Sequence, residues 1–239
     1  NYYNLLDKNS QHWQVNLAKK YGLFGFCFYF YFFNGKTLLE QPLINWLQDK
    51  SLDFPFCLCW ANENWTRRWD GLDDELLIKQ NYSPKADREF IHHITPYLKD
   101  PRYIRIDGRP LIIVYRPGKM PNPSFSASQW RFECNRSGVG EIYLAYTQSF
   151  DSDPPEAYGF DGAIQFPPIG IHTESITAKF KPLAEGARYA VHDYKQLIAR
   201  ATSEYKTSTT YTLFPGVCPG WDNTSRRGQN GADILQNTT

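Results

Sequence analysis

Apolar runs of strand length alternate along the chain with segments whose apolar residues recur at helical spacing. The strand-like runs occupy residues 23–33, 54–60, 110–115, 142–146, 162–166 and 213–217. The helix-like segments occupy residues 11–21, 42–50, 84–98, 128–135 and 193–204, and we assign no element to 169–186. Continuous apolar runs are typical of strands buried on both faces of a parallel sheet. The pattern therefore predicts about six βα units, with a parallel sheet, in one α/β domain over residues 1–239.

Proline and capping residues indicate where some of these helices begin and end. Pro42 suits the first turn of the second helix, although Thr37 and Glu40 form a competing capping-box signal. Ser83 is a capping residue for the third helix, and Pro96 is expected to break the last turn of that helix.

Polar and aromatic residues follow the carboxyl ends of several predicted strands. They occur at 34–35, 60–70, 116, 146–148, 165–168 and 221–227. In α/β barrels the loops at this edge carry the ligand site, because a rigid scaffold positions them. This convergence predicts a (β/α)8 TIM-barrel-like fold with one cleft. The sequence has no G-x-G-x-x-G turn, phosphate-binding loop or G-x-S-x-G elbow, which argues against nucleotide cradling and against a serine hydrolase.

The run FPFCLCWANENWTRRWDG, residues 54–71, carries the strongest site signal. An apolar strand is followed at once by Asn62 and Glu63, which are expected just beyond its carboxyl end, and then by Asp70. Polar chemistry at the end of a buried strand predicts a binding or catalytic site.

The side chains that follow suit a sugar. Trp65 and Trp69 offer flat apolar faces, and Arg67 and Arg68 supply hydrogen-bond donors that stay protonated. A sugar ring is apolar on its carbon–hydrogen face and is rimmed by hydroxyls, so it matches this mixture. The alternative is a tryptophan-rich loop that packs on its neighbours, with Arg67 or Arg68 paired with Asp70 at the surface.

Composition narrows the class of protein. The chain has 239 residues, of which 41% are hydrophobic and 16% aromatic, so it is long enough for one sizeable core. The formal net charge is +1 and the charged residues are scattered, which argues against nucleic-acid partners and against an anionic membrane surface. The longest apolar run, 23–33, is too short to span a membrane.

The five cysteines show no C-x-x-C spacing and lie mostly inside apolar stretches. We interpret them as buried small hydrophobes in a reducing compartment, which predicts a cytoplasmic location. Cys57 and Cys59 share a strand face, but no second pair follows at metal spacing, and His92 and His93 diverge on a helix. We expect no metal and no cofactor.

Four stretches together resemble a known family. YGLFGFCFYFYFFNGKTLLEQPL, FPFCLCWANENWTRRWDG, PYLKDPRYIRIDGRPLIIVYRP and WDNTSRRG are similar to the WbsX family, described as glycosyltransferases of lipopolysaccharide and O-antigen biosynthesis. That family is itself similar to glycoside hydrolase family 99, whose fold is an eight-fold α/β barrel. The resemblance covers nearly the whole chain and is strongest before Arg116 and near Trp221.

The resemblance implies that the residues matching the family pattern line a glycan cleft. One wall is formed by Trp60, Asn62, Glu63, Trp65, Arg67, Trp69 and Asp70, and another by Trp221, Asp222, Asn223, Arg226 and Arg227. The candidate catalytic residues among them are Glu63, Asp70 and Asp222. Glycosyl cleavage or transfer generally needs a carboxylic acid or base beside an oxocarbenium-like centre.

Two motifs of the family pattern are missing between Asn1 and Thr239: an early strand with a Glu-Trp motif and a late strand with an Asn-Glu-Trp-x-x-Gly motif. We therefore expect an incomplete barrel, truncated at both ends, and leave open whether the parent chain carries further domains. Unpaired sheet edges would make the isolated chain poorly soluble. If the principal acid lies in the late segment, Glu63 binds hydroxyls rather than moving the proton.

The resemblance implies a carbohydrate-active protein whose partner is an oligo- or polysaccharide of the bacterial surface. Glycosyl transfer and hydrolysis both stay open, because fold analogy does not choose between them. The lack of a nucleotide signature favours hydrolase-like chemistry. The alternative is a glycan-binding or catalytically inactive fragment.

Overall fold

The computed structural model describes residues 3–67, 72–169, 173–181, 188–204, 210–227 and 230–236. The chain divides into two compact units. The first unit comprises residues 1–63, 80–147 and 153–162, and the second comprises 64–79, 148–152 and 163–239. Each unit is described by itself.

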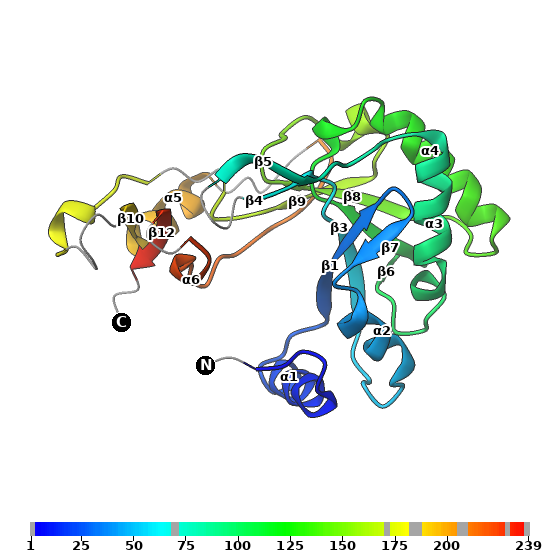
Figure 1. The fold of residues 1–239 in the computed structure, drawn as a ribbon, viewed down its shortest axis with the longest axis horizontal. Helices are drawn as coiled ribbons and strands as arrows, with labels where there is room; N and C mark the ends of the chain where they lie inside the picture. The colour runs from blue at the N-terminus through cyan, green and yellow to red at the C-terminus, as the bar shows by residue number, and fades with distance from the viewer. Residues whose placement is uncertain are drawn as a thin grey trace. The chain divides into compact units, whose positions relative to one another are not determined.

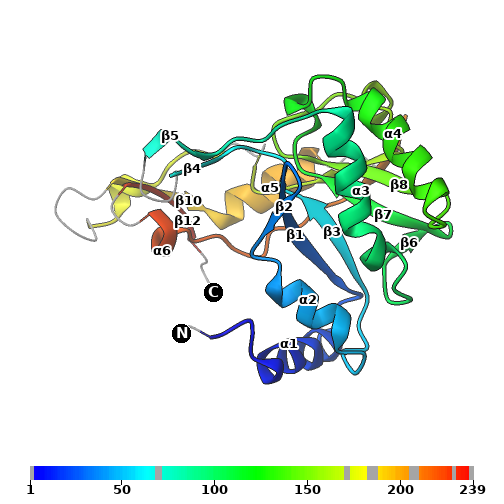
Figure 2. The same ribbon diagram turned by 45° about the vertical axis from the view of Figure 1, so that its right-hand side comes forward.

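The first unit is built on a mostly parallel sheet with the strand order β8-β7-β3-β1-β2 (Figures 1 and 2). These strands are β1 (Phe26–Phe33), β2 (Lys36–Leu38), β3 (Phe56–Trp60), β7 (Arg109–Val114) and β8 (Tyr143–Gln148). Strands β1, β3, β7 and β8 run parallel, whereas β2 and the short β6 (Arg105–Ile106) are antiparallel hairpin partners of β1 and β7. The predicted α/β fold with parallel strands is confirmed.

One face of this sheet is covered by α2 (Gln41–Gln48), α3 (Pro84–Leu98) and α4 (Pro123–Arg136) (Figure 1). The ring of Trp46 on α2 lies 5.2 Å from that of Phe28, and the ring of Phe90 on α3 stacks 4.7 Å from that of Trp60. Trp130 on α4 contacts the same Trp60 ring edge-on at 5.8 Å. Large aromatic pairs of this kind supply much of the burial that holds helices to a sheet.

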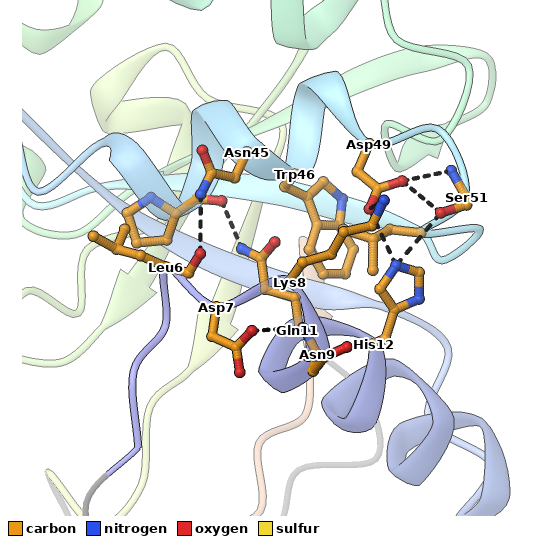
Figure 3. A network of polar contacts seen from close by, with 12 residues as sticks. Leu6, Asp7, Lys8, Asn9, Gln11, His12, Asn45, Trp46, Asp49 and Ser51 are labelled. Atoms are coloured by element: carbon orange, nitrogen blue, oxygen red, sulfur yellow. Dashed lines mark hydrogen bonds and ion pairs between the residues drawn. The ribbon is translucent and has the colours of Figure 1, made fainter.

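Helix α1 (Lys8–Lys20) lies beside α2, as Figures 1 and 2 both show, and polar contacts join the two helices (Figure 3). The amide of Gln11 donates to the carbonyl of Pro42 over 2.8 Å. Lys8 and His12 lie 3.0 and 3.1 Å from the carboxylate of Asp49. The hydroxyl of Ser51, together with these two side chains, holds the pKa of Asp49 well below its ordinary value.

Capping explains where the helix boundaries agree with the prediction and where they differ. Ser83 caps α3 by accepting from the amide of Ala86, as predicted, but α3 continues through Pro96 to Leu98. Thr37 lies in β2, and α2 begins only at Gln41, so the competing capping box of Thr37 and Glu40 does not form. Helix α4 begins at Pro123, earlier than predicted, because Asn122 caps the amide of Phe125.

The described part of the second unit contains three strand pairs. They are β4 (Trp65–Arg67) with β5 (Leu72–Ile78), β9 (Gly162–Gln165) with β11 (Thr212–Phe214), and β10 (Arg188–Asp193) with β12 (Asn230–Gln236). The helices are α5 (Tyr194–Glu204) and α6 (Thr224–Arg227). The first and third pairs were not predicted, because their strands are short or polar and lack a continuous apolar run. Short 3₁₀ turns span Pro117–Lys119 and Pro155–Tyr158 in the first unit and Thr177–Lys179 in the second.

A groove of about 1010 Å³ follows one edge of β1, between β1, α1 and α2. Six consecutive residues, Phe26 to Tyr31, line it. Since side chains alternate between the two faces of a strand, such a run means that the groove follows the strand edge. On this side β2 pairs only with the last three residues of β1, and among the described residues no strand pairs with the rest. The sheet of the first unit is open here.

The cysteines differ in exposure. Cys57, Cys59 and Cys134 are buried as predicted, whereas Cys27 is exposed and Cys218 is half-buried. The interpretation of all five as buried hydrophobes is therefore wrong for Cys27, because its strand borders the groove. In the described part of the chain, no helix combines the length and the apolar character needed to cross a membrane.

Candidate functional site

The site of the first unit is built where β3 and β7 end side by side. Trp60, the last residue of β3, pairs with Val114, the last residue of β7. Continuing this register by two residues places Asn62 opposite Arg116. The side chain of Asn62 takes over the pairing: its Oδ1 accepts from the amide of Arg116 and its Nδ2 donates to the carbonyl of Arg116, both over 2.7 Å.

Glu63 and Arg116 form an ion pair at this edge. Nη1 of Arg116 donates to Oε1 of Glu63 over 2.6 Å, and the two side chains are 17% and 30% exposed, respectively. Because Asn62 fixes the backbone of Arg116, the guanidinium that contacts Glu63 extends from a rigid part of the main chain. Charge-assisted hydrogen bonds of this length are the stronger kind, so the carboxylate is held in a defined position.

Tyr82 supports Asn62 from the segment before α3. Its hydroxyl donates to the carbonyl of Asn62 over 2.5 Å and receives a longer, 3.3 Å hydrogen bond from Nδ2 of Asn62. Burial raises the pKa of Tyr82 to about 12, so the phenol stays a neutral donor. Asn62 is itself fully buried, which makes it a positioning residue rather than a group that reaches solvent.

Trp60 belongs to the core. Its exposed fraction is 3%, its ring stacks on Phe90, and its Nε1 donates to the carbonyl of Phe32 over 3.3 Å. The structure thus uses Trp60 to anchor the end of β3, on the face that α3 and α4 cover.

Aromatic side chains gather on the opposite face of the sheet. Tyr29 and Tyr31 stack with ring centroids 6.3 Å apart, and Tyr29 meets Tyr115 edge-on at 6.1 Å. The hydroxyl of Thr147 on β8 donates to the carbonyl of Tyr115 over 2.8 Å, which ties the neighbouring strand end to this cluster. Tyr29 is 45% exposed, so part of its ring is open to a ligand.

Sequence reasoning placed Arg116 at a strand end without assigning it to the site, and it missed Tyr82, Tyr29 and Tyr115. The signal for Tyr29 was present, since alternation along FCFYFYFF puts Cys27, Tyr29 and Tyr31 on one face. No local signal marks Tyr82, because its role depends on contact with a residue from another strand.

The other predicted site residues belong to the second unit. Trp65 lies on β4, while Arg67 ends that strand with a side chain outside the described part. Trp69 and Asp70 fall outside the described residues, as does the side chain of Arg226.

The segment from Trp221 to Arg227 forms a turn onto α6. Oδ1 of Asp222 accepts from the amide of Thr224 over 2.9 Å, which forms an Asx turn before α6. Oδ1 of Asn223 accepts from the amide of Asp233 over 2.7 Å, which ties the turn to β12. Trp221 is 41% exposed, and the amide of Arg227 donates to the carbonyl of Asn223. The structure brings these residues together and gives Asp222 and Asn223 local structural contacts.

In the residues that the structure describes, no three histidine, cysteine, aspartate or glutamate side chains are grouped to hold a metal ion. The chemistry offered by the first unit is hydrogen bonding and aromatic contact. Glu63 provides acceptors, Arg116 provides donors, and the tyrosines provide ring faces.

Comparison with known proteins places these observations in a family. Residues 1–239 match the family described as glycosyltransferase WbsX. Two curated proteins called uncharacterized protein WxcX, from two strains of Xanthomonas campestris pv. campestris, are each 46% identical over 234 residues. The match covers 98% of this chain and 33% of theirs, so the chain spans about a third of the length of these relatives.

Two solved structures share the fold. A glycoside hydrolase-like protein superposes with a TM-score of 0.55 at 13% identity, covering 98% of this chain and 70% of that one. The GH99 endo-alpha-mannosidase from Bacteroides thetaiotaomicron superposes with a TM-score of 0.55 at 18% identity, covering 95% and 58%. At these identities the likeness shows the fold, an α/β sheet similar to that of the GH99 barrels.

Proposed function

The chain belongs to the glycosyltransferase WbsX family, and from this premise we propose that it forms the glycan-binding core of an enzyme acting on a bacterial surface polysaccharide. Family and fold together make it a carbohydrate-active protein. The proposed substrate is the polysaccharide of lipopolysaccharide or O-antigen, and the proposed reaction is transfer or hydrolysis of a glycosyl group at the carboxyl ends of the strands. Because the chain spans a third of its relatives, this activity is proposed for the longer protein.

The observation that carries the proposal is the Glu63–Arg116 ion pair at the ends of β3 and β7. A carboxylate and a guanidinium side by side offer an acceptor and a donor to neighbouring hydroxyls of one sugar. Both groups are partly exposed, and the backbone of Arg116 is fixed by its hydrogen bonds to Asn62. Sites whose groups are fixed in advance lose less entropy when they bind.

The tyrosine cluster supports the same proposal. Tyr29, Tyr31 and Tyr115 lie on the face of the sheet that α2, α3 and α4 leave uncovered. Ring faces of this kind receive the apolar face of a sugar, while the hydroxyl rims reach polar groups. The tyrosine cluster thus offers apolar ring faces, whereas the ion pair offers hydrogen-bond donors and acceptors.

We assign Glu63 to binding hydroxyls rather than to moving the proton. Its Oε1 already accepts a 2.6 Å hydrogen bond from Arg116, which suits a carboxylate that serves as a fixed acceptor. Proton transfer is then proposed for Asp70, for Asp222 or for a carboxylate elsewhere in the longer protein. Loss of Glu63 is expected to weaken substrate binding more than the chemical step.

The experiment compares three forms of the longer protein that contains this chain: wild type, Glu63→Gln and Glu89→Gln. Glu89 is a matched control, because it is 32% exposed and ion-paired with Lys85 on α3. Binding to purified O-antigen polysaccharide is measured by calorimetry, and products are analysed with and without an activated sugar donor. We expect Glu63→Gln to raise the Kd or KM about tenfold with a smaller change in kcat, and Glu89→Gln to change neither.

The product analysis distinguishes hydrolysis, glycosyl transfer and binding without turnover. Release of reducing ends without a donor supports hydrolysis, and donor-dependent chain growth supports transfer. Binding without turnover would show a glycan-binding or inactive protein. A loss of kcat at unchanged affinity in Glu63→Gln would overturn the binding role of Glu63.

We also propose a cytoplasmic location. All five cysteines are free thiols in the structure, as is usual in a reducing compartment.

A further inference from the structure

Three thiols meet on adjacent strands at the start of the sheet. Cys27 on β1 is paired with Cys57 on β3 in the parallel ladder, and Cys59 lies two residues further along β3. Since side chains two residues apart point to the same face, the three sulfur atoms share one side of the sheet. Cys27 and Cys57 are the second residues of their strands, whereas Glu63 and Arg116 follow the carboxyl-terminal ends.

The thiols differ in their access to solvent. Cys57 and Cys59 are buried, with exposed fractions of 3% each. Cys27 is exposed and lines the groove beside α1 and α2, so a small oxidant reaches it first.

The pKa of Cys27 responds to its two neighbours. The nearby thiols of Cys57 and Cys59 lower the pKa of the Cys27 thiol well below its ordinary value. The same contact, together with burial, raises the pKa values of Cys57 and Cys59. Cys27, the exposed residue of the three, is therefore also the one with the lowered thiol pKa. A lower pKa leaves more of the thiol as thiolate, which is the nucleophilic form of cysteine.

We propose that Cys27 is a peroxide-reactive cysteine and that Cys57 is its resolving partner, so that β1 and β3 carry a reversible disulfide site. In the first step the Cys27 sulfur attacks one oxygen of hydrogen peroxide and the O–O bond breaks. Cys27 becomes a sulfenic acid, and the departing hydroxide takes up a proton to form water. In the second step the Cys57 sulfur attacks the Cys27 sulfur, the S–O bond breaks, and the hydroxide leaves with the Cys57 proton as water. Two thiols have then lost two electrons and two protons to one peroxide, and two external thiols reverse the change.

Geometry selects Cys57 over Cys59 as the partner. Adjacent strands lie ~4.8 Å apart, and a disulfide needs Cα atoms within about 7 Å of each other. Cys57 faces Cys27 directly in the ladder and meets this condition. Cys59 is displaced by two further residues, or ~6.6 Å along the strand, which puts its Cα ~8 Å away.

Metal binding is a weaker use for these thiols. In the part of the chain that the structure describes, no three cysteine, histidine or acidic side chains have the arrangement of a metal site.

Cys134 lies outside the cluster and differs from Cys27. It is buried, and burial raises the pKa of its thiol to about 12.

The test oxidises the longer protein that contains this chain with hydrogen peroxide, alkylates the remaining thiols and identifies disulfides by peptide mass spectrometry without reduction. We expect a Cys27–Cys57 disulfide that dithiothreitol reverses. Cys27→Ser should abolish it, Cys57→Ser should leave a Cys27 sulfenic acid that dimedone captures, and the control Cys134→Ser should change nothing. A disulfide that forms equally in Cys27→Ser, or a dominant Cys27–Cys59 product, would overturn the proposal.

A second measurement uses only the wild-type form of the longer protein and does not depend on the folding of any variant. The rate of iodoacetamide labelling is compared between Cys27 and Cys218, which is half-buried and lies outside the cluster. Cys27 should react on the order of tenfold faster at neutral pH, because more of it is thiolate. Equal labelling rates for Cys27 and Cys218 would show that Cys27 is not unusually reactive and would overturn the proposal.

Discussion

The side-chain amide of Asn62 makes two 2.7 Å hydrogen bonds to the backbone of Arg116, a residue 54 positions away in the chain. In this way an amide side chain extends the pairing of β3 with β7 beyond the last strand residues. The arrangement fixes the base of the guanidinium that holds Glu63.

Asn62→Ala should therefore destabilise the protein by about 2 kcal/mol or more, because it leaves the amide and the carbonyl of Arg116 without these partners in a buried place. Glycan affinity should fall as well, since the guanidinium loses its fixed base. Urea denaturation measures the stability, and Asn135→Ala, an exposed asparagine on α4, is the control. Equal denaturation midpoints for Asn62→Ala and wild type would refute the positioning role.

Tyr82→Phe should reduce the sensitivity of the protein to alkali. The folded state raises the pKa of Tyr82 from the ordinary 10.0 to about 12, so the neutral phenol stabilises the fold fully below pH ~10. That contribution is lost as the pH rises from about 10 towards 12. Thermal unfolding across this range should show a smaller loss of Tm per pH unit in Tyr82→Phe than in wild type, and identical slopes would contradict the assignment.

Asp87 on α3 is a buried carboxylate that accepts 3.0 Å hydrogen bonds from Ser126 and Trp130 on α4. Burial raises the pKa of Asp87, so the protonated form favours the fold: this contribution is full below the ordinary value of 3.8 and is lost as the pH rises through the folded-state value. Asp87→Asn keeps an acceptor for Trp130 and a donor for Ser126 without the charge. We expect Asp87→Asn to be at least as stable as wild type at neutral pH.

The paired variants decide whether charge or contact matters at this position. Asp87→Ala should cost about 2–4 kcal/mol, because two buried donors lose their acceptor. Asp53→Asn is the exposed control, since its side chain is 90% exposed. Urea denaturation of these variants over a pH series checks the expectation, and a large loss in Asp87→Asn at neutral pH would show that the charge itself stabilises the helix pair.

Gly25→Ala should destabilise the start of β1. A Cβ at residue 25 would lie 2.7 Å from the carbonyl oxygen of Pro55, which accepts the 2.9 Å hydrogen bond of the Phe26 amide and so cannot move freely. Overpacking of this kind costs about 1–3 kcal/mol. Gly220→Ala, where a Cβ would meet nothing within 4 Å, should be neutral. The urea denaturation midpoints of the two variants are compared with that of wild type. An unchanged midpoint for Gly25→Ala would mean that the backbone at the start of β1 shifts to make room for the Cβ.

The sequence by itself determined the α/β class, the parallel strands and the edge at which polar residues gather. The apolar run at 56–60 and the Asn62–Glu63 pair after it are local features, and alternation and strand ends follow from backbone geometry alone. The WbsX resemblance was carried in the same way by contiguous motifs, and the match over residues 1–239 confirms it.

The tertiary structure alone decided which side chains meet. Trp60 is the last residue of its strand by sequence, but its burial depends on Phe90 and Trp130, which come from helices formed later in the chain. Likewise, the register of β1 against β3 sets Cys27 beside Cys57, and the register of β3 against β7 sets Asn62 beside Arg116. Local sequence does not encode these contacts, because strand register and helix packing are fixed by long-range burial rather than by neighbours in the chain.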